Sequence, residues 1–222
     1  MQIEFGLMQN AIDSLERSID LLAWRDEPDE SRKLKEAIQS IAHGVELLLK
    51  ERLRRIHPAL LWESVDKYQN LDARTVGCDL AVARLERIGK LHFAKEDVAL
   101  IRALRATRNA IEHYQWSTTR KEAERIIGEA LAFAVVFASN ELHYDFFGYR
   151  NRKDDTLPQL CKTHPHFAVA LERLEMRQPD TGVLPLTKCP FCRAIGFDSE
   201  KHACAVCGHW EYANSLDDDD YI

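Results

Sequence analysis

Three things are scarce in this sequence of 222 residues: glycine, long apolar runs and net positive charge. Only nine residues are glycine, whereas Leu, Ala, Glu and Arg dominate, and this balance favours helices over a sheet sandwich. The longest strongly apolar run, residues 130–138, is about half of what a bilayer span requires. Residues 1–4 lack the basic and apolar pattern of a secretory signal. We therefore expect a cytoplasmic protein without a membrane contact.

The sequence also lacks the short motifs of several large enzyme classes. It has no glycine-rich phosphate loop, no His-Glu-x-x-His motif and no convincing Ser-His-Asp set. The formal net charge of −6 excludes a basic coat for nucleic acid, although part of the deficit lies in the acidic run 217–220. Local basic patches on the remaining body stay compatible with phosphate binding.

What the sequence does contain is helical periodicity. Apolar residues recur at steps of three and four, most clearly within 31–55, where Pro58 enforces the end of the helix. Thr119 followed by Glu122 fits a capping box at the start of another helix. We expect amphipathic helices over about 4–23, 31–55, 76–88, 95–114 and 119–142. Short connections between them predict an all-α fold, an antiparallel helical bundle.

Composition divides the chain into four parts. The bundle is predicted for 1–148, a proline-marked linker with one short helix at 166–176 for 149–182, a cysteine-rich module for 183–214 and an acidic tail for 215–222. No internal repeat is visible.

The cysteine-rich module carries two Cys-x-x-Cys pairs, Cys189 with Cys192 and Cys204 with Cys207, separated by eleven residues. Four thiolates at this spacing complete a tetrahedral zinc site and leave no open position for water, so the zinc is expected to be structural. An iron–sulfur cluster is less favoured by the spacing. The module resembles a zinc ribbon over roughly thirty residues. Its charge is mixed, so nucleic-acid binding, protein binding and simple folding all remain open as its role.

A second candidate site lies in the helix predicted for 95–114. Asn109 and His113 are four residues apart and so share one helical face, and Arg108 adjoins them. Histidine, amide and arginine suit phosphate chemistry, as proton carrier, positioning group and cation for a pentavalent phosphate. Arg105 and Arg102, about one and two turns earlier, are candidate RNA contacts.

The same residues also allow an ordinary structural interpretation. Arg108 and Glu112 are four apart and match a surface ion pair, and a histidine that ends a helix commonly bonds the last carbonyls. The spacing alone leaves both interpretations open.

The segment Arg108-Asn109-Ala-Ile-Glu112-His113 resembles the signature of HEPN domains, and residues 43–53 resemble the second long helix of such proteins. The resemblance covers about residues 5–145 and implies a helical bundle that usually dimerises and cleaves RNA without metal. It implies that His113 acts as general base or acid at the ribose 2'-hydroxyl and the leaving oxygen. Arg108 would stabilise the pentavalent phosphate, and Asn109 would orient an oxygen or His113. The products would be a 2',3'-cyclic phosphate and a 5'-hydroxyl.

By the same resemblance we expect a toxin or antiviral defence role, with RNA, a second copy of the chain and an antitoxin or defence protein as partners. One departure concerns a regulatory tyrosine that some toxin members carry two positions after the histidine. Here Tyr114 follows directly and Gln115 occupies that position. Two other functions remain open: a non-catalytic module that binds RNA or nucleotides, and a zinc-ribbon adaptor between proteins.

Overall fold

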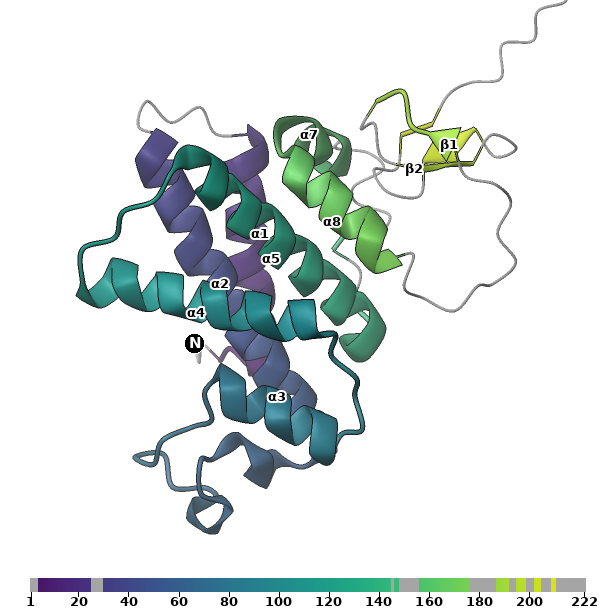
Figure 1. The fold of residues 1–222 in the computed structure, drawn as a ribbon. Coiled ribbons are helices and arrows are strands. Elements are labelled where there is room, and N and C mark those ends of the chain that lie inside the picture. Colours follow the sequence, from purple (N-terminus) through teal and green to yellow (C-terminus); the bar gives the residue numbers. More distant parts are fainter. Residues whose placement is uncertain are drawn as a thin grey trace, which may run out of the picture.

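The computed structural model describes residues 4–24, 30–144, 146–147, 156–175, 187–191, 195–198, 202–204 and 209–210, and helices dominate this part of the chain. Its helices are α1 (Leu7–Trp24), α2 (Glu30–Ile56), α3 (Cys78–Arg87), α4 (Lys95–His113), α5 (Arg120–Leu142), α7 (Thr156–Thr163) and α8 (Pro165–Glu175), shown in Figure 1. Two 3-10 turns, Pro58–Leu61 and Val65–Lys67, lie between α2 and α3. The predicted all-α class is confirmed for the body of the protein.

The five predicted helices coincide with α1 to α5 within a few residues at each end. α2 ends at Ile56, two residues before Pro58, because proline at that point removes a backbone donor and clashes with the preceding turn. α5 begins after Thr119, whose hydroxyl oxygen accepts a hydrogen bond of 3.2 Å from the Glu122 amide.

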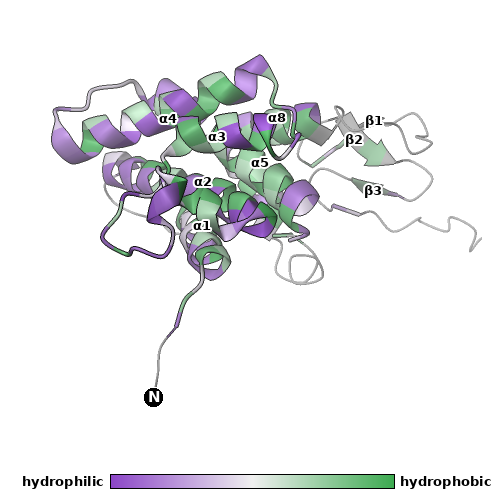
Figure 2. Ribbon diagram, turned by 90° about the horizontal axis from the view of Figure 1, so that it is seen from below, coloured by the Kyte–Doolittle hydropathy of each residue, from purple (hydrophilic) through white to green (hydrophobic). Residues whose placement is uncertain are grey.

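The core lies where α2 and α5 meet, with α1 and α8 packed on either side. Each of the two central helices contributes thirteen buried residues, and their largest fully buried side chains are Ile38, Ile41, Leu48, Leu49, Leu53, Ile127 and Leu131. In Figure 2 the hydrophobic residues gather in the middle of the bundle, and the hydrophilic ones face outward. No helix within the described ranges combines the length and apolar character of a membrane span.

The stretch predicted as a linker with one short helix contains two helices that pack against the bundle. α8 occupies the predicted position, whereas α7 was not expected; α7 packs against α1, and α8 packs against α5 (Figure 1). The Trp24 indole donates a hydrogen bond of 3.3 Å to the Thr156 hydroxyl, which ties the end of α1 to the start of α7. The bundle thus continues past residue 148.

A small antiparallel sheet follows, with strands β1 (Thr187–Lys188), β2 (Ile195–Asp198) and β3 (Ala203–Cys204) in the order β1-β2-β3. Thr187 pairs with Phe197, and Phe197 pairs with Cys204 on its other side. These strands lie within the predicted cysteine-rich module.

Candidate functional site

Exposure sets α4 apart from the other long helices. It buries Asp97, Ile101 and Leu104 out of 19 residues, whereas α5 buries thirteen out of 23. α4 crosses over α2 and α5 (Figure 1), and its last residue is His113. The next residue, Tyr114, is extended, and its amide closes the helix by donating to the Ala110 carbonyl at 3.0 Å. The segment singled out from the sequence therefore forms the C-terminal end of the most exposed long helix.

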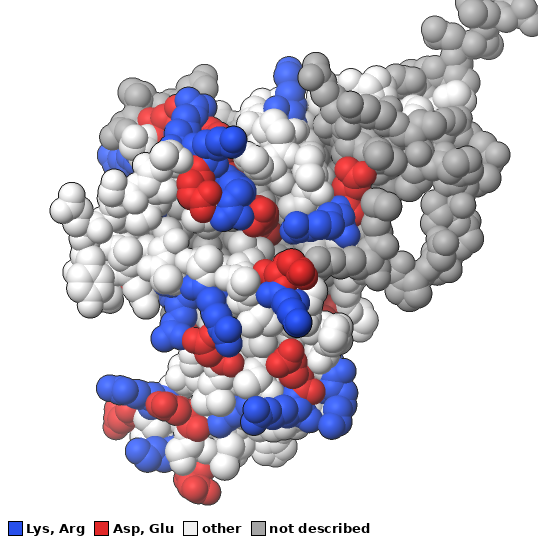
Figure 3. Space-filling model, viewed as in Figure 1, with Lys and Arg blue, Asp and Glu red and all other residues white. Residues whose placement is uncertain are grey.

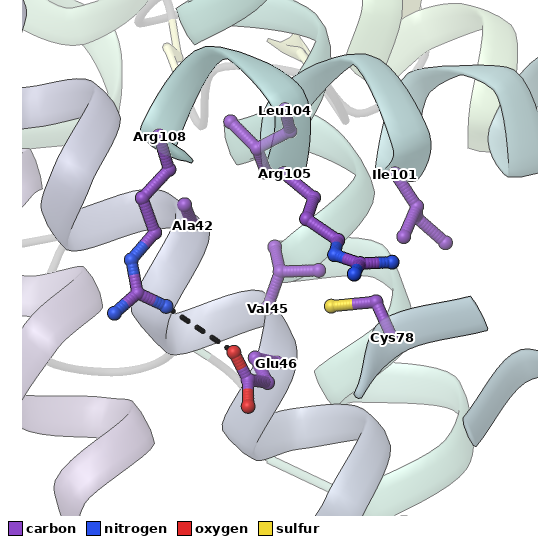
Figure 4. A pocket seen from close by; sticks show the side chains of 8 residues that line it. All are labelled: Ala42, Val45, Glu46, Cys78, Ile101, Leu104, Arg105 and Arg108. Atoms are coloured by element: carbon purple, nitrogen blue, oxygen red, sulfur yellow. Dashed lines mark hydrogen bonds and ion pairs between the residues drawn. The ribbon is translucent and has the colours of Figure 1, made fainter. Parts of the chain in front are cut away.

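Arg108 is held by two carboxylates on different helices. Its Nε donates to Glu112 Oε1 at 2.8 Å, and its Nη1 donates to Glu46 Oε2 on α2 at 3.2 Å (Figure 4). Glu46 also accepts from Lys50 Nζ at 2.6 Å, and Lys50 donates to the Thr75 hydroxyl at 3.0 Å. Burial opposes the charge of Arg108, but the hydrogen bond and charge of Glu112, together with Glu46, raise the pKa of Arg108. The guanidinium is a fixed cation.

The side chains of His113 and Asn109 are exposed to solvent. The His113 side chain is 66% exposed, and its Nε2 lies 4.0 Å from Glu112 Oε2. Asn109 is exposed, and its side chain makes no hydrogen bond within the described part of the chain. Arg108 points toward α2, where it reaches Glu46. His113 follows five residues later, which is a rotation of roughly 140° around the helix, so it points in another direction. Arg108 and His113 are therefore linked through Glu112 and do not converge on one point.

The other two arginines of α4 are paired with one carboxylate. Arg102 Nε donates to Asp79 Oδ1 at 3.1 Å, and Arg105 forms an ion pair with Asp79 Oδ2. Figure 3 shows positive and negative side chains interspersed over the face that carries α4. Arg102 and Arg105 remain about half exposed or more, so they are accessible to a phosphate that can compete with Asp79.

A pocket lies between α2, α3 and α4 beside Arg108. Its lining consists of Ala42, Val45, Glu46, Cys78, Ile101, Leu104, Arg105 and Arg108, as Figure 4 shows. Asn109 and His113 are not part of it. Burial raises the pKa of the Cys78 thiol to about 11, so this cysteine is protonated and is no nucleophile.

One further residue belongs to this region, and sequence reasoning gave it no role. His43 lies on α2, and its Nδ1 is 2.8 Å from the Ser14 hydroxyl of α1. Burial and then the Arg108 guanidinium lower the pKa of His43, so its imidazole is neutral at pH 7. The spacing of His43, Glu46 and Lys50 along one helical face was the available indication.

The predicted metal ligands are only partly placed. Cys189 and Cys204 are buried, and the Phe191 amide donates to Cys189 Sγ at 3.4 Å. The rings of Phe191 and His209 stack at 5.1 Å between centroids, so residues beside the first and the second cysteine pair are in contact. Cys192 and Cys207 lie outside the described residues, and within those residues no group of three or more metal-binding side chains is found.

Comparisons of the chain with protein-family models, curated proteins and solved structures find no match. The assignment of a function therefore depends on the α4 site and on the two cysteine pairs.

Proposed function

We propose that the protein is a metal-independent endoribonuclease of the HEPN type, with Arg108, Asn109 and His113 as its catalytic residues. The observation that carries this proposal is the end of α4, where a fixed guanidinium and an exposed imidazole flank the same carboxylate, Glu112. A permanent cation suits the charge that develops on a pentavalent phosphate. An accessible histidine suits proton transfer near neutral pH.

Each residue then has one task on the RNA. Arg108 stabilises the phosphate, the exposed Asn109 amide orients one of its oxygens, and His113 transfers a proton at the ribose 2'-hydroxyl or the leaving oxygen. Attack of the 2'-oxygen releases a 5'-hydroxyl and leaves a 2',3'-cyclic phosphate.

Dimerisation accounts for the divergence of Arg108 and His113 within one protomer. A two-fold axis beside the exposed face of α4 would bring the partner's copy of the segment opposite the first. RNA and a second copy of the chain are thus the proposed partners. A toxin or antiviral defence role, with an antitoxin or defence protein that restrains cleavage, follows from the family resemblance alone.

Cleavage of RNA should depend on His113 and not on divalent cations. We expect His113→Ala to slow cleavage by about 10²–10⁴-fold, the usual contribution of a general acid or base. The reaction is followed with and without EDTA, and the product ends are identified as cyclic phosphate and 5'-hydroxyl. The matched control is His92→Ala, an exposed histidine just before α4, roughly 27 Å away along a helix of 19 residues. Equal rates for wild type and His113→Ala would refute the proposal.

A second function is favoured by one observation, the pairing of Arg108 with both Glu46 and Glu112. A guanidinium that already pairs with two carboxylates fits a module that binds RNA or nucleotides, or a protein adaptor, without chemistry. RNA affinity measured at two salt concentrations separates these functions, since phosphate contacts weaken steeply as salt rises. A binding module keeps this affinity in His113→Ala and cleaves nothing, whereas an adaptor has no such affinity.

We also propose that Cys189, Cys192, Cys204 and Cys207 hold a structural zinc ion. The backbone amide that donates to Cys189 Sγ is the kind of bond that stabilises a metal-bound thiolate. The buried Cys204 belongs to the strand next to β2, and its amide donates to the His209 carbonyl at 2.7 Å. Zinc would supply the folding free energy that so small a sheet cannot obtain from its core.

A further inference from the structure

His43 lies next to the α4 site although it belongs to another helix. His43, Glu46 and Lys50 share one face of α2, at steps of three and four residues. Glu46 of this set holds Arg108 through a hydrogen bond of 3.2 Å (Figure 4). His43 is thus one helical turn from the carboxylate that positions the proposed phosphate-binding arginine.

The hydrogen bonds around His43 assign its tautomer. The Ser14 hydroxyl has a single hydrogen, which it donates to the Asn10 carbonyl at 2.9 Å. With this donation, the Ser14 oxygen accepts in the contact of 2.8 Å with His43 Nδ1, and we assign the ring hydrogen to Nδ1. The lone pair of the neutral ring is then at Nε2. No described residue forms a hydrogen bond with this nitrogen, so it is free to take a proton from a ligand.

Four charged groups influence the protonation of His43, and they act in opposite directions. Arg108 and Lys50 disfavour the imidazolium, whereas Glu46 and Glu112 favour it. Burial is the largest influence and, with Arg108, makes the net effect a lowered pKa. A neutral imidazole at pH 7 is the protonation state that a general base requires.

We propose that His43 is the general base of the site and that His113 is the general acid. This inference rests on the proposed ribonuclease function. His43 Nε2 takes the proton of the ribose 2'-hydroxyl while the 2'-oxygen forms a bond to phosphorus. The bond from phosphorus to the 5'-oxygen breaks, and the protonated His113 donates its proton to that oxygen. One proton is gained by His43 and one is lost by His113, so the step is balanced.

A chain of contacts runs from His113 to Glu46, which lies one helical turn from His43 on α2. His113 Nε2 is 4.0 Å from Glu112, Glu112 is 2.8 Å from Arg108, and Arg108 is 3.2 Å from Glu46. Arg108 is the central member of this chain, where a bound phosphate would meet it. His113 is the last residue of α4 and its side chain is exposed, so the leaving oxygen of a bound RNA can reach it.

Two substrates separate the base from the acid. RNA cleavage should fall by about 10²–10⁴-fold in both His43→Gln and His113→Ala. A nucleoside 3'-phosphate esterified with p-nitrophenol has a leaving group that needs no protonation. On this ester His113→Ala should regain nearly the wild-type rate, whereas His43→Gln should remain slow. Ser14→Ala should show an intermediate loss, since the Nδ1–H tautomer then has no acceptor.

His92→Gln serves as the control for an exposed histidine, and thermal melting of each variant establishes that it is folded. A folded His43→Gln that cleaves RNA at the rate of His92→Gln, beside an inactive His113→Ala, would overturn the role of His43 and leave the proposed ribonuclease intact. Recovery of His43→Gln on the nitrophenyl ester would also overturn it, because His43 would then act as the acid. A wild type that cleaves neither substrate contradicts the ribonuclease itself.

Discussion

Gly128→Ala is expected to lower the free energy of unfolding by about 3 kcal/mol, the upper end of the usual cost of overpacking, although alanine is the better helix former. A β-carbon at Gly128 would lie 2.5 Å from the Phe167 amide nitrogen and 2.7 Å from the His166 carbonyl carbon. Backbone atoms at this distance cannot give way as the end of a flexible side chain can. α8 would have to move away from α5 and uncover Phe167, which is fully buried.

Chemical denaturation of three glycine variants tests this expectation. In Gly44→Ala the new β-carbon would meet the Leu15 side chain at 2.6 Å, which can partly readjust, so a smaller loss is expected. In Gly6→Ala the nearest atom, Gln9 Oε1, is 3.8 Å away, so almost no loss is expected. Hydrogen exchange should locate the effect of Gly128→Ala in α7 and α8. If Gly128→Ala is as stable as Gly6→Ala, the backbone of α8 does not approach Gly128 as closely as described.

Cys204→Ser is expected to abolish stoichiometric zinc binding and to unfold the strands around β2, while α1 to α5 stay folded. A structural zinc site contributes on the order of 10 kcal/mol of binding free energy, and serine replaces a soft thiolate by a poor ligand. Nearly all buried apolar side chains belong to the helices, so the melting temperature of the bundle should hardly change. Metal analysis of the purified protein and the circular dichroism of the variant measure both effects.

Cysteines outside the two pairs supply the matched controls. Cys78 in α3 and Cys161 in α7 are both buried, yet neither belongs to a Cys-x-x-Cys pair. Cys78→Ser and Cys161→Ser should retain one zinc ion per chain. Retention of a full zinc ion by Cys204→Ser would instead rule out the four-cysteine site.

Much of the fold was predictable because its determinants are local. The apolar spacing of 31–55 predicted α2, Pro58 predicted its end, and the hydroxyl of Thr119 caps α5 as its sequence motif indicates. Each of these features depends on residues within one or two helical turns. The ends of the elements accordingly agree with the structure within a few residues.

α7 could not be predicted, because its proline was interpreted as a break. Pro158 is the third residue of α7 and Pro165 is the first residue of α8. Proline is tolerated in the first turn of a helix, where its missing amide has no intrahelical partner in any case. What makes these short helices stable is packing against α1 and α5, which are distant in sequence.

The site shows the same division between local and distant contacts. The Arg108–Glu112 pair was foreseen from a spacing of four residues, and it forms. The pair with Glu46 joins positions 62 residues apart, so no periodicity indicates it. The contact between His43 and Ser14 likewise requires the packing of α1 on α2. Sequence therefore located the motif, whereas tertiary packing determined what surrounds it.

The packing of α8 on α5 also has a consequence for synthesis on the ribosome. α5 is complete once Leu142 has been added, but the helix that covers its outer side ends at Glu175. At roughly 5–20 residues per second, the nascent chain exposes this apolar surface for a few seconds in every round of translation. Pausing or premature termination between Leu142 and Glu175 would leave an aggregation-prone intermediate with this apolar surface exposed. The need for chaperones should be greatest at this stage of translation.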